Sequence, residues 1–267
     1  MRKFTLVLTL FAVIALQFNL AAPKAAAQAE WLNLTNVNKG VIGVQYAVKK
    51  NIKTKVMIVR GADKYTYNLT ANQEEMFPLQ LGNGEYTITL LENTTGNQYK
   101  VAGRETVTVK LADAKNVFLN SIQNVNWTPS STAIVKAKEI TEQKKTDADK
   151  VKAVYEYIIN NVKYDKKLAA NVTTDYIPQI DKTFETNKDI CYGYAALTAA
   201  MLRSLDIPTK LVMGTTDQLD VYHAWNEVYL NGKWVIIDTT IDAGLNNGTK
   251  TFKMIKNSNQ YKMEKQY

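Results

Sequence analysis

A strand–turn–strand pattern in the last third of the chain places the strongest constraint on its fold. Residues 223–230 and 233–238 are rich in β-branched and aromatic side chains, and Asn231-Gly232 separates the two runs. Asn-Gly between two such runs is the strongest short-range signal for a two-residue β-hairpin, because both positions accept the left-handed backbone of that turn. We therefore predict an antiparallel hairpin over residues 223–238.

The two-residue turn also determines which residues face one another across the hairpin. Counting back from the turn puts Trp225 opposite Asp238 and His223 opposite Thr240. His223 and Asp238 then lie on one face as diagonal neighbours, about 7 Å apart at the backbone, which an imidazole and a carboxylate can span. A slip of one residue would send them to opposite faces, so their proximity is a specific prediction of this register.

The chain has one cysteine, Cys191, and one histidine, His223. After Asp189, apolar residues recur with helical spacing up to residue 205, and Pro208 ends the pattern. We interpret Asp189 as the helix N-cap, which places Cys191 in the first turn, where unpaired backbone N–H groups and the helix dipole stabilise a thiolate. Cys191, His223 and Asp238 are therefore the candidate catalytic residues.

These three residue types form a complete set for acyl transfer. A thiol becomes a strong nucleophile when an adjacent imidazole takes its proton. A carboxylate that accepts the imidazole N–H holds the ring in one tautomer and stabilises the imidazolium. One cysteine and one histidine are too few for a thiolate-rich or imidazole-rich metal site, so we expect no metal and no cofactor.

Several segments resemble the core of the transglutaminase-like superfamily, whose fold is similar to that of papain-like cysteine proteases. They are Cys191-Tyr192-Gly193-Tyr194-Ala195, Met201-Leu202-Arg203, Ile207-Pro208, His223-Ala224-Trp225-Asn226-Glu227-Val228 and residues 234–238. The resemblance covers about residues 132–245 and implies Cys191 as the nucleophile, His223 as the base and Asp238 as the orienting carboxylate. Thr239 stands where many relatives have proline. The residues before Cys191 differ from the Tyr-Gly-Gln-Cys-Trp signature of animal crosslinking transglutaminases, so the resemblance does not imply protein crosslinking.

The same resemblance implies an aromatic side chain, upstream of the nucleophile, that donates a hydrogen bond to the developing oxyanion. Tyr164 and Tyr176 both precede Cys191, and Tyr164 is the candidate by analogy. The alternative is a half-buried tyrosine that only packs. Glu227 shares the strand face of His223, either as a partner of the histidine or in a structural salt bridge.

The first residues indicate export. Arg2 and Lys3 precede an apolar stretch over residues 4–16, and Ala27-Gln28-Ala29 offers a small-x-small cleavage site. This pattern is typical of a signal peptide, here residues 1–29. The apolar stretch is short for a membrane span, so we expect a secreted, extracellular chain with no transmembrane segment.

Charge bears on the partners of the exported chain. Residues 1–29 contain three basic residues and no acid, so their removal lowers the formal net charge of +8 by three. A basic secreted protein is attracted to anionic cell-envelope polymers, which favours association with the envelope. No sustained basic run with interleaved aromatic residues is present, and we expect no nucleic-acid partner.

The composition pattern changes near residue 126. Residues 30–125 alternate apolar and polar side chains in short runs separated by Gly and Asn turns, which predicts an immunoglobulin-like β-sandwich as an accessory domain. Helical periodicity dominates the first half of residues 126–267, which predicts an α+β, transglutaminase-like or papain-like cysteine enzyme domain. All the candidate catalytic residues lie in this second domain.

Together these patterns predict a secreted cysteine acyl-transfer enzyme that acts on amide bonds of protein or cell-envelope peptide substrates through a thioester intermediate. Water as acceptor would make it a hydrolase or protease, and an amine would make it a transglutaminase. The alternative is a noncatalytic envelope-binding or structural protein that retains the fold.

Overall fold

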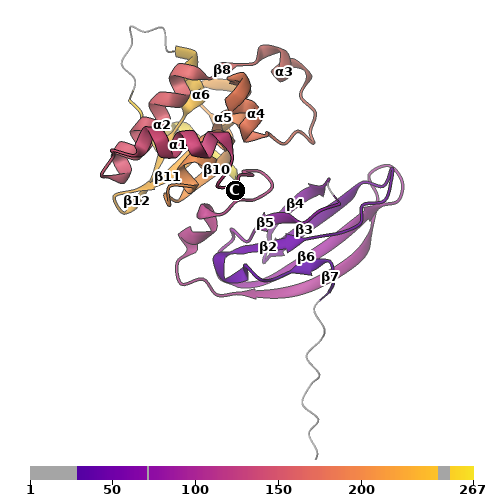
Figure 1. Ribbon diagram of the computed structural model, residues 1–267. Helices are drawn as coiled ribbons and strands as arrows, with labels where there is room; N and C mark the ends of the chain where they lie inside the picture. The colour runs from indigo at the N-terminus through magenta and orange to yellow at the C-terminus, as the bar shows by residue number, and fades with distance from the viewer. Residues whose placement is uncertain (1–28, 71, 246–252) are drawn as a thin grey trace, which may run out of the picture.

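The computed structural model describes residues 29–70, 72–245 and 253–267, and it divides into a strand-rich part and a helix-rich part (Figure 1). The predicted signal peptide, residues 1–29, lies almost wholly outside the described residues. Within the described ranges, no helix has the length and apolar character needed to cross a bilayer. The fold is of mixed α and β type, with several antiparallel sheets.

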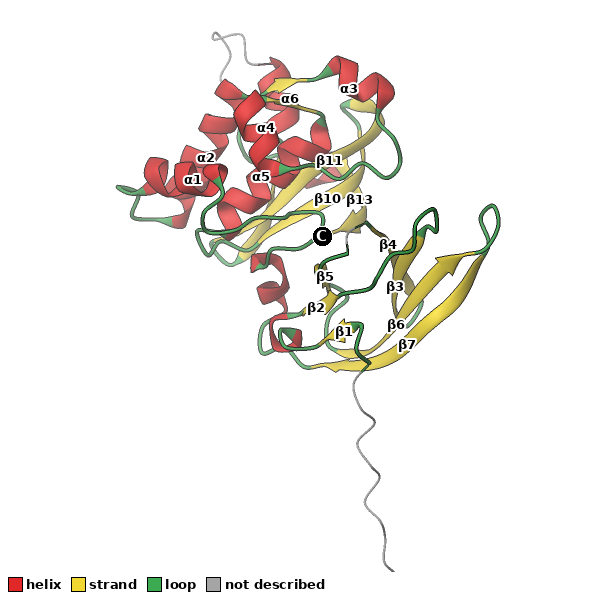
Figure 2. Ribbon diagram, turned by 45° about the vertical axis from the view of Figure 1, so that its right-hand side comes forward, coloured by secondary structure: helices red, strands yellow, loops and turns green. Residues whose placement is uncertain are grey.

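Two antiparallel sheets form the strand-rich part (Figure 2). Their strands, in spatial order, are β1 (Leu32–Asn33), β2 (Val41–Val44) and β5 (Glu75–Pro78) in the first, and β4 (Asp63–Leu69), β3 (Thr54–Arg60), β6 (Gly84–Asn93) and β7 (Tyr99–Val109) in the second. The 3-10 helix η1 (Val37–Lys39) lies between β1 and β2 in sequence, and the 3-10 helix η2 (Ala114–Leu119) follows β7. Ile42 and Phe77 of the first sheet share one buried cluster with Ile58 and Ile88 of the second.

The helix-rich part is built around one four-stranded antiparallel sheet. Its strands, in spatial order, are β12 (Lys233–Ile237), β11 (Leu219–Leu230), β10 (Thr209–Thr216) and β13 (Tyr261–Gln266). The helices are α1 (Thr132–Thr141), α2 (Asp147–Asn161), α3 (Lys166–Asn171), α4 (Ile180–Thr186), α5 (Cys191–Arg203), α6 (Thr239–Leu245) and the 3-10 helix η3 (Ser258–Gln260). A short parallel pair, β8 (Lys163–Tyr164) and β9 (Lys188–Asp189), precedes α5.

Helix α5 is the central element of this part and is buried from Gly193 to Arg203. Small side chains at Ala195, Ala199 and Ala200 leave room for close packing, and the Asn226 side chain on β11 donates to the Ala195 carbonyl at 2.9 Å. A buried side chain that satisfies a helix carbonyl fixes how helix and sheet align. The start of α5 is thereby held against β11.

The hairpin forms with the predicted register. Leu230 pairs with Lys233, and Asn231 and Gly232 have φ of 51° and 82°, as a type I′ turn requires. The prediction that His223 faces Thr240 is wrong, because β12 ends at Ile237 and α6 begins two residues later. His223 instead pairs with Gly214 on β10.

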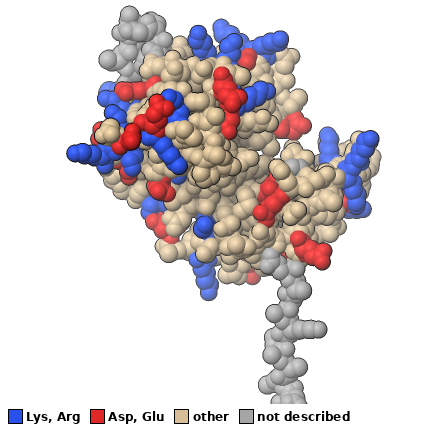
Figure 3. Space-filling model, in the orientation of Figure 1, with Lys and Arg blue, Asp and Glu red and all other residues tan. Residues whose placement is uncertain are grey.

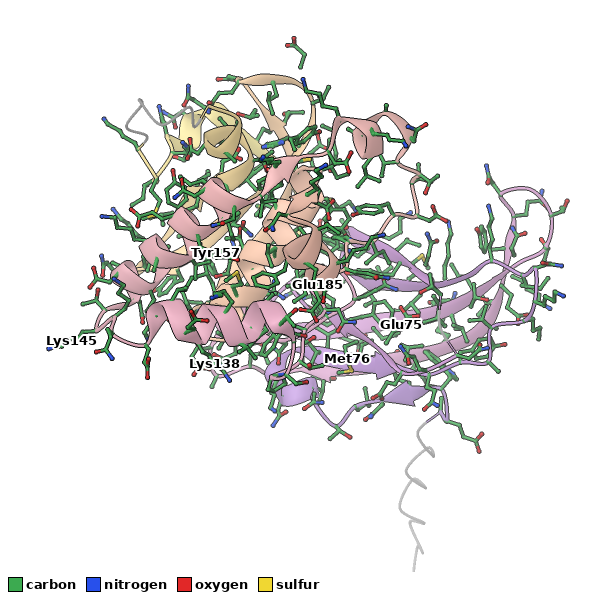
Figure 4. All side chains as sticks on the ribbon, turned by 45° about the horizontal axis from the view of Figure 1, so that its top comes forward. Glu75, Met76, Lys138, Lys145, Tyr157 and Glu185 are labelled. Carbon is green, nitrogen blue, oxygen red and sulfur yellow. The ribbon has the colours of Figure 1, made fainter. Side chains whose placement is uncertain are left out.

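The two parts share buried contacts. Val41, Ile122 and Val125 belong to the core cluster of the helix-rich part, and Met76 packs against the same cluster. Figure 4 shows Met76 and Glu75 where the strand-rich part meets the helices. The guanidinium of Arg203, 1% exposed, donates to the carbonyl oxygen of Asn120 at 2.8 Å. Residues before the predicted boundary at 125/126 therefore contribute to the core around α5.

Candidate active site

Cys191 is the first residue of α5 and is partly buried. The N-cap position belongs to Ile190, whose side chain makes no capping hydrogen bond, so the interpretation of Asp189 as the N-cap is wrong by one residue. The consequence drawn from it holds, because Cys191 still lies in the first turn. There its sulfur is close to the unpaired N–H groups and the positive end of the helix dipole.

Asp189 holds together the segment before Cys191. Its side chain is buried and accepts hydrogen bonds from the Tyr176 hydroxyl at 2.8 Å, the Thr183 hydroxyl at 2.5 Å and the Ile190 amide at 2.7 Å. It packs over Gly193, where a Cβ atom would lie 1.9 Å from the Asp189 Cγ. These four contacts hold the strand before Cys191 against the first turn of α5.

His223 lies between Cys191 and Asp238. Its Nε2 is 2.8 Å from Asp238 Oδ2, and Cys191 lies close enough to raise the His223 pKa as a hydrogen-bond partner and as a charge. Because Asp238 occupies Nε2, Nδ1 is the nitrogen left for the thiol. Burial lowers the pKa of His223, but the hydrogen bonds and charges of Asp238 and Cys191 outweigh burial and raise this pKa from 6.5 to about 9. The site therefore favours an imidazolium at neutral pH.

Asp238 is fully buried and receives three donors. Oδ1 accepts the Ile241 amide at 3.1 Å, in the first turn of α6. Oδ2 accepts His223 Nε2 and, at 3.1 Å, the hydroxyl of Tyr261 from β13. Tyr261 was not predicted as a site residue, because residues 261–266 carry no clear strand periodicity.

A buried cluster anchors α6, the helix that begins just after Asp238. Asp242, 1% exposed, accepts the Tyr155 hydroxyl of α2 at 2.7 Å and the Lys256 ammonium at 2.5 Å. Burial raises the pKa of Asp242, and the Lys256 and Tyr155 hydrogen bonds oppose that rise. These bonds fix the turn that presents the Asp238 carboxylate to His223.

Neighbouring side chains on β11 pack rather than react. The Trp225 ring is 1% exposed and lies against the rings of both His223, at 6.3 Å, and Tyr261, at 5.1 Å between centroids. Glu227 forms a salt bridge with Lys210 at 2.8 Å. Of its two alternatives, the structure therefore gives Glu227 the structural salt bridge.

The two tyrosines considered for the oxyanion have different surroundings. Tyr176 donates its hydroxyl to Asp189 and is thus engaged. Tyr164 is 42% exposed, and its backbone pairs with Asp189 at the entrance to α5. Burial, followed by the charge of Cys191, raises the pKa of Tyr164.

A cavity of about 610 Å³ lies between the strand-rich part and the segment before α4. Its lining includes Glu75, Met76, Trp127 and residues 177–182, but not Cys191. Near Cys191, the hydroxyl of Tyr192 accepts a hydrogen bond from Asn124 at 2.6 Å. A residue before the predicted boundary at 125/126 therefore contacts the residue that follows Cys191.

Charged side chains of both signs lie interspersed on the face of the helix-rich part in Figure 3. In the described part of the chain, no group of three or more His, Cys, Asp or Glu side chains could hold a metal ion.

Comparison with known proteins places this geometry in a family context. Residues 135–239 match the family model of the transglutaminase-like superfamily. Over 117 residues the chain is 28% identical to the kyphoscoliosis peptidase of Homo sapiens and 27% identical to that of Mus musculus. Those stretches cover 40% of this chain but only 18% of each relative.

Two solved structures are also similar. A structure described as a TGase is 28% identical, with a TM-score of 0.36, over 44% of this chain and 34% of the other. The periplasmic domain of TgpA from Pseudomonas aeruginosa is 13% identical, with a TM-score of 0.41, over 82% of this chain and 96% of that domain.

Proposed function

We propose, on the premise that residues 135–239 belong to the transglutaminase-like superfamily, that the chain is a cysteine acyl-transfer enzyme acting on amide bonds. The observation that carries the proposal is the position of His223, whose Nε2 lies 2.8 Å from Asp238 Oδ2 and whose pKa is raised by the neighbouring Cys191 side chain. The only cysteine and the only histidine of the chain thus meet at the start of one helix.

In the first half-reaction, the Cys191 thiolate attacks the amide carbonyl carbon and the C=O electron pair moves to oxygen. The N–H groups at the start of α5 stabilise this oxyanion, and Tyr164 is the proposed side-chain donor. When the tetrahedral intermediate collapses, the C–N bond breaks and the His223 imidazolium gives its proton to the leaving amine. A thioester on Cys191 remains.

The second half-reaction restores the enzyme. His223, now neutral, takes a proton from an acceptor that attacks the thioester, and the Cys191 sulfur leaves as thiolate. Asp238 holds the ring by Nε2 throughout, which keeps Nδ1 directed at the reacting atoms. Water as the acceptor gives hydrolysis. An amine gives transamidation, and the name of the curated relatives, kyphoscoliosis peptidase, favours hydrolysis of peptides.

The setting of the enzyme belongs to the same proposal. The leader-like pattern of residues 1–29 supports export, and the positive net charge of the remaining chain supports attraction to anionic envelope polymers. The two facing sheets of residues 30–125 support an immunoglobulin-like accessory domain, and residues 126–267 would form the catalytic domain.

Trapping of the thioester tests the proposal. The full chain is incubated with cell-envelope peptides or glutamine-containing proteins, quenched in acid and analysed by mass spectrometry. We expect an added acyl mass on the peptide that contains Cys191, and none in Cys191→Ala. If no acyl adduct forms, and iodoacetamide alkylates Cys191 at the same rate in wild type and in His223→Ala, the chain is a noncatalytic member of the fold.

A further inference from the structure

Tyr261 is the least expected neighbour of the proposed catalytic residues, because it lies 22 residues beyond the end of the family match at residue 239. It is the first residue of β13, the strand added to the β10 edge of the sheet. Its hydroxyl lies 3.1 Å from Asp238 Oδ2, the same oxygen that binds His223 Nε2 at 2.8 Å. An ionised carboxylate only accepts hydrogen bonds, so the hydroxyl is the donor.

The position of this hydroxyl is fixed from several sides. The Tyr261 ring lies edge-on to Trp225, which also stacks against His223, so one buried indole orients both rings. Gln218 donates to the Tyr261 oxygen at 3.2 Å, and Thr216, the backbone partner of Tyr261 on β10, lies beside it and lowers its pKa. A donor held this way is preorganised for a single acceptor.

The hydroxyl also stays protonated. Burial and the charge of Asp238 raise the pKa of Tyr261 far above its usual value of 10.0, so it remains a donor over the whole pH range in which an enzyme of this kind works.

We infer that Tyr261 is a positioning residue of the proposed active site, which shares Asp238 Oδ2 with His223 and so sets both the direction and the strength of the His223–Asp238 hydrogen bond. The effect of Tyr261 on catalysis rests on the proposed function, but its effect on the His223–Asp238 hydrogen bond does not. Each donor to a carboxylate oxygen takes up part of its negative charge, and the charge that is left for His223 is correspondingly smaller.

The test exploits the fact that His223 is the only histidine of the chain. In protein freed of any histidine tag, its ring signals in NMR report one titration without ambiguity. Tyr261→Phe keeps the ring on Trp225 and removes only the hydroxyl. We expect the His223 pKa to rise by at least about half a unit, because Asp238 Oδ2 then serves a single side-chain donor. Tyr229→Phe, on the same sheet and packed against Trp234, is the matched control and should leave the titration unchanged.

Catalytic activity is the second measurement. With an activated ester such as p-nitrophenyl acetate, Tyr261→Phe should lower kcat roughly 10- to 150-fold, the range expected for one hydrogen bond to a charged group. The alkaline limb of its pH profile should move upward with the His223 pKa. If the wild-type chain does not turn over the ester, the proposed function fails. The NMR titration of His223 still decides the role of Tyr261. A folded Tyr261→Phe with the wild-type His223 pKa would overturn the inference.

Thr216→Val provides the test if Tyr261→Phe does not fold. It removes the Thr216 hydroxyl, which lowers the Tyr261 pKa from a buried position on the paired strand, while a β-branched side chain is kept. The hydroxyl then becomes a weaker donor to Asp238, so the His223 pKa should rise by less than in Tyr261→Phe. No rise in Thr216→Val would equally overturn the inference.

Discussion

At the scale of single residues, His223 is governed by a balance between burial and its two partners. Burial alone would hold its pKa below 6.5, and the contacts with Asp238 and Cys191 bring that pKa to about 9. Below about 9 the ring therefore favours the imidazolium form, which the proposed mechanism needs as the proton donor. The carboxylate of Asp238 contributes both a hydrogen bond and a charge to this balance.

Asp238→Asn tests that balance. The amide can still accept the ring N–H, but it carries no charge, so the His223 pKa should fall well below about 9 while burial continues to lower it. We expect kcat to fall roughly 10²- to 10⁴-fold, as for loss of a general acid–base group. NMR titration of the single histidine and ester turnover measure the two effects. Glu227→Gln, which removes a carboxylate from the Lys210 salt bridge on the same strand, is the control.

The double variant Cys191→Ala/Asp238→Asn shows whether the residues act as one unit. Without the Cys191 thiol there is no acyl transfer for a mispositioned His223 to slow. The double variant should therefore be no slower than Cys191→Ala. Rate losses that add in free-energy terms would contradict the assignment of a shared mechanism.

At the scale of elements, the first turn of α5 depends on Gly193. Alanine is favoured over glycine inside helices by about 1 kcal/mol, yet here its Cβ would meet the Asp189 carboxyl at 1.9 Å. Tyr176 and Thr183 both donate to that carboxyl, so it has no room to withdraw. Steric exclusion therefore outweighs helix propensity at this position.

Gly193→Ala should accordingly lower the free energy of unfolding by about 1–3 kcal/mol and reduce the rate at which iodoacetamide alkylates Cys191. Gly244→Ala in α6 is the matched control, because no atom lies within 4 Å of its added Cβ. The control should be neutral or slightly stabilising in urea unfolding. If the two variants unfold alike, the packing of Asp189 on Gly193 has no energetic role.

Some elements were predictable from the sequence because their signals are local. Asn231-Gly232 specifies the hairpin register, and with it the approach of His223 to Asp238. Thr146, of a residue type typical of N-caps, stands just before α2, and its hydroxyl accepts a hydrogen bond from the Asp149 amide at 3.1 Å.

Other elements depend on contacts made far along the chain. Strand β13 lies beyond residues 246–252, which the structure does not describe. Its sequence has no clear strand pattern, and the strand forms through its pairing with β10. The local sequence makes Asp189 a candidate N-cap, but hydrogen bonds from the Tyr176 and Thr183 hydroxyls hold its side chain in the interior. A local sequence pattern carries no information about such tertiary contacts.

At the scale of the whole molecule, the strand-rich part contributes directly to the surroundings of α5. The carbonyl oxygen of Asn120 accepts a hydrogen bond from the buried Arg203 guanidinium, and Asn124 donates to Tyr192 next to Cys191. Ile122 and Val125 complete the same core. The sequence-based prediction that residues 126–267 contain all the chemistry remains a prediction, and these contacts argue against full independence of that region.

The last prediction concerns a chain that begins at Thr128, compared with one that begins at Glu30. The shorter chain leaves Arg203 without one of its carbonyl acceptors and exposes the apolar surface that Val41, Ile122 and Val125 covered. Because each buried aliphatic side chain contributes about 1.5–3 kcal/mol, we expect the free energy of unfolding to fall by at least about 3 kcal/mol. Ester turnover should fall with it, since Tyr192 loses Asn124.

Asn124→Ala in the longer chain separates the two causes. It removes only the hydrogen bond to Tyr192, so a loss of turnover with near-normal urea unfolding would assign that loss to the start of α5. Circular dichroism establishes that each chain is folded before turnover is compared. A chain from Thr128 with undiminished stability and full turnover would show that the helix-rich part is self-sufficient, and that its shared core with the two sheets serves neither folding nor catalysis.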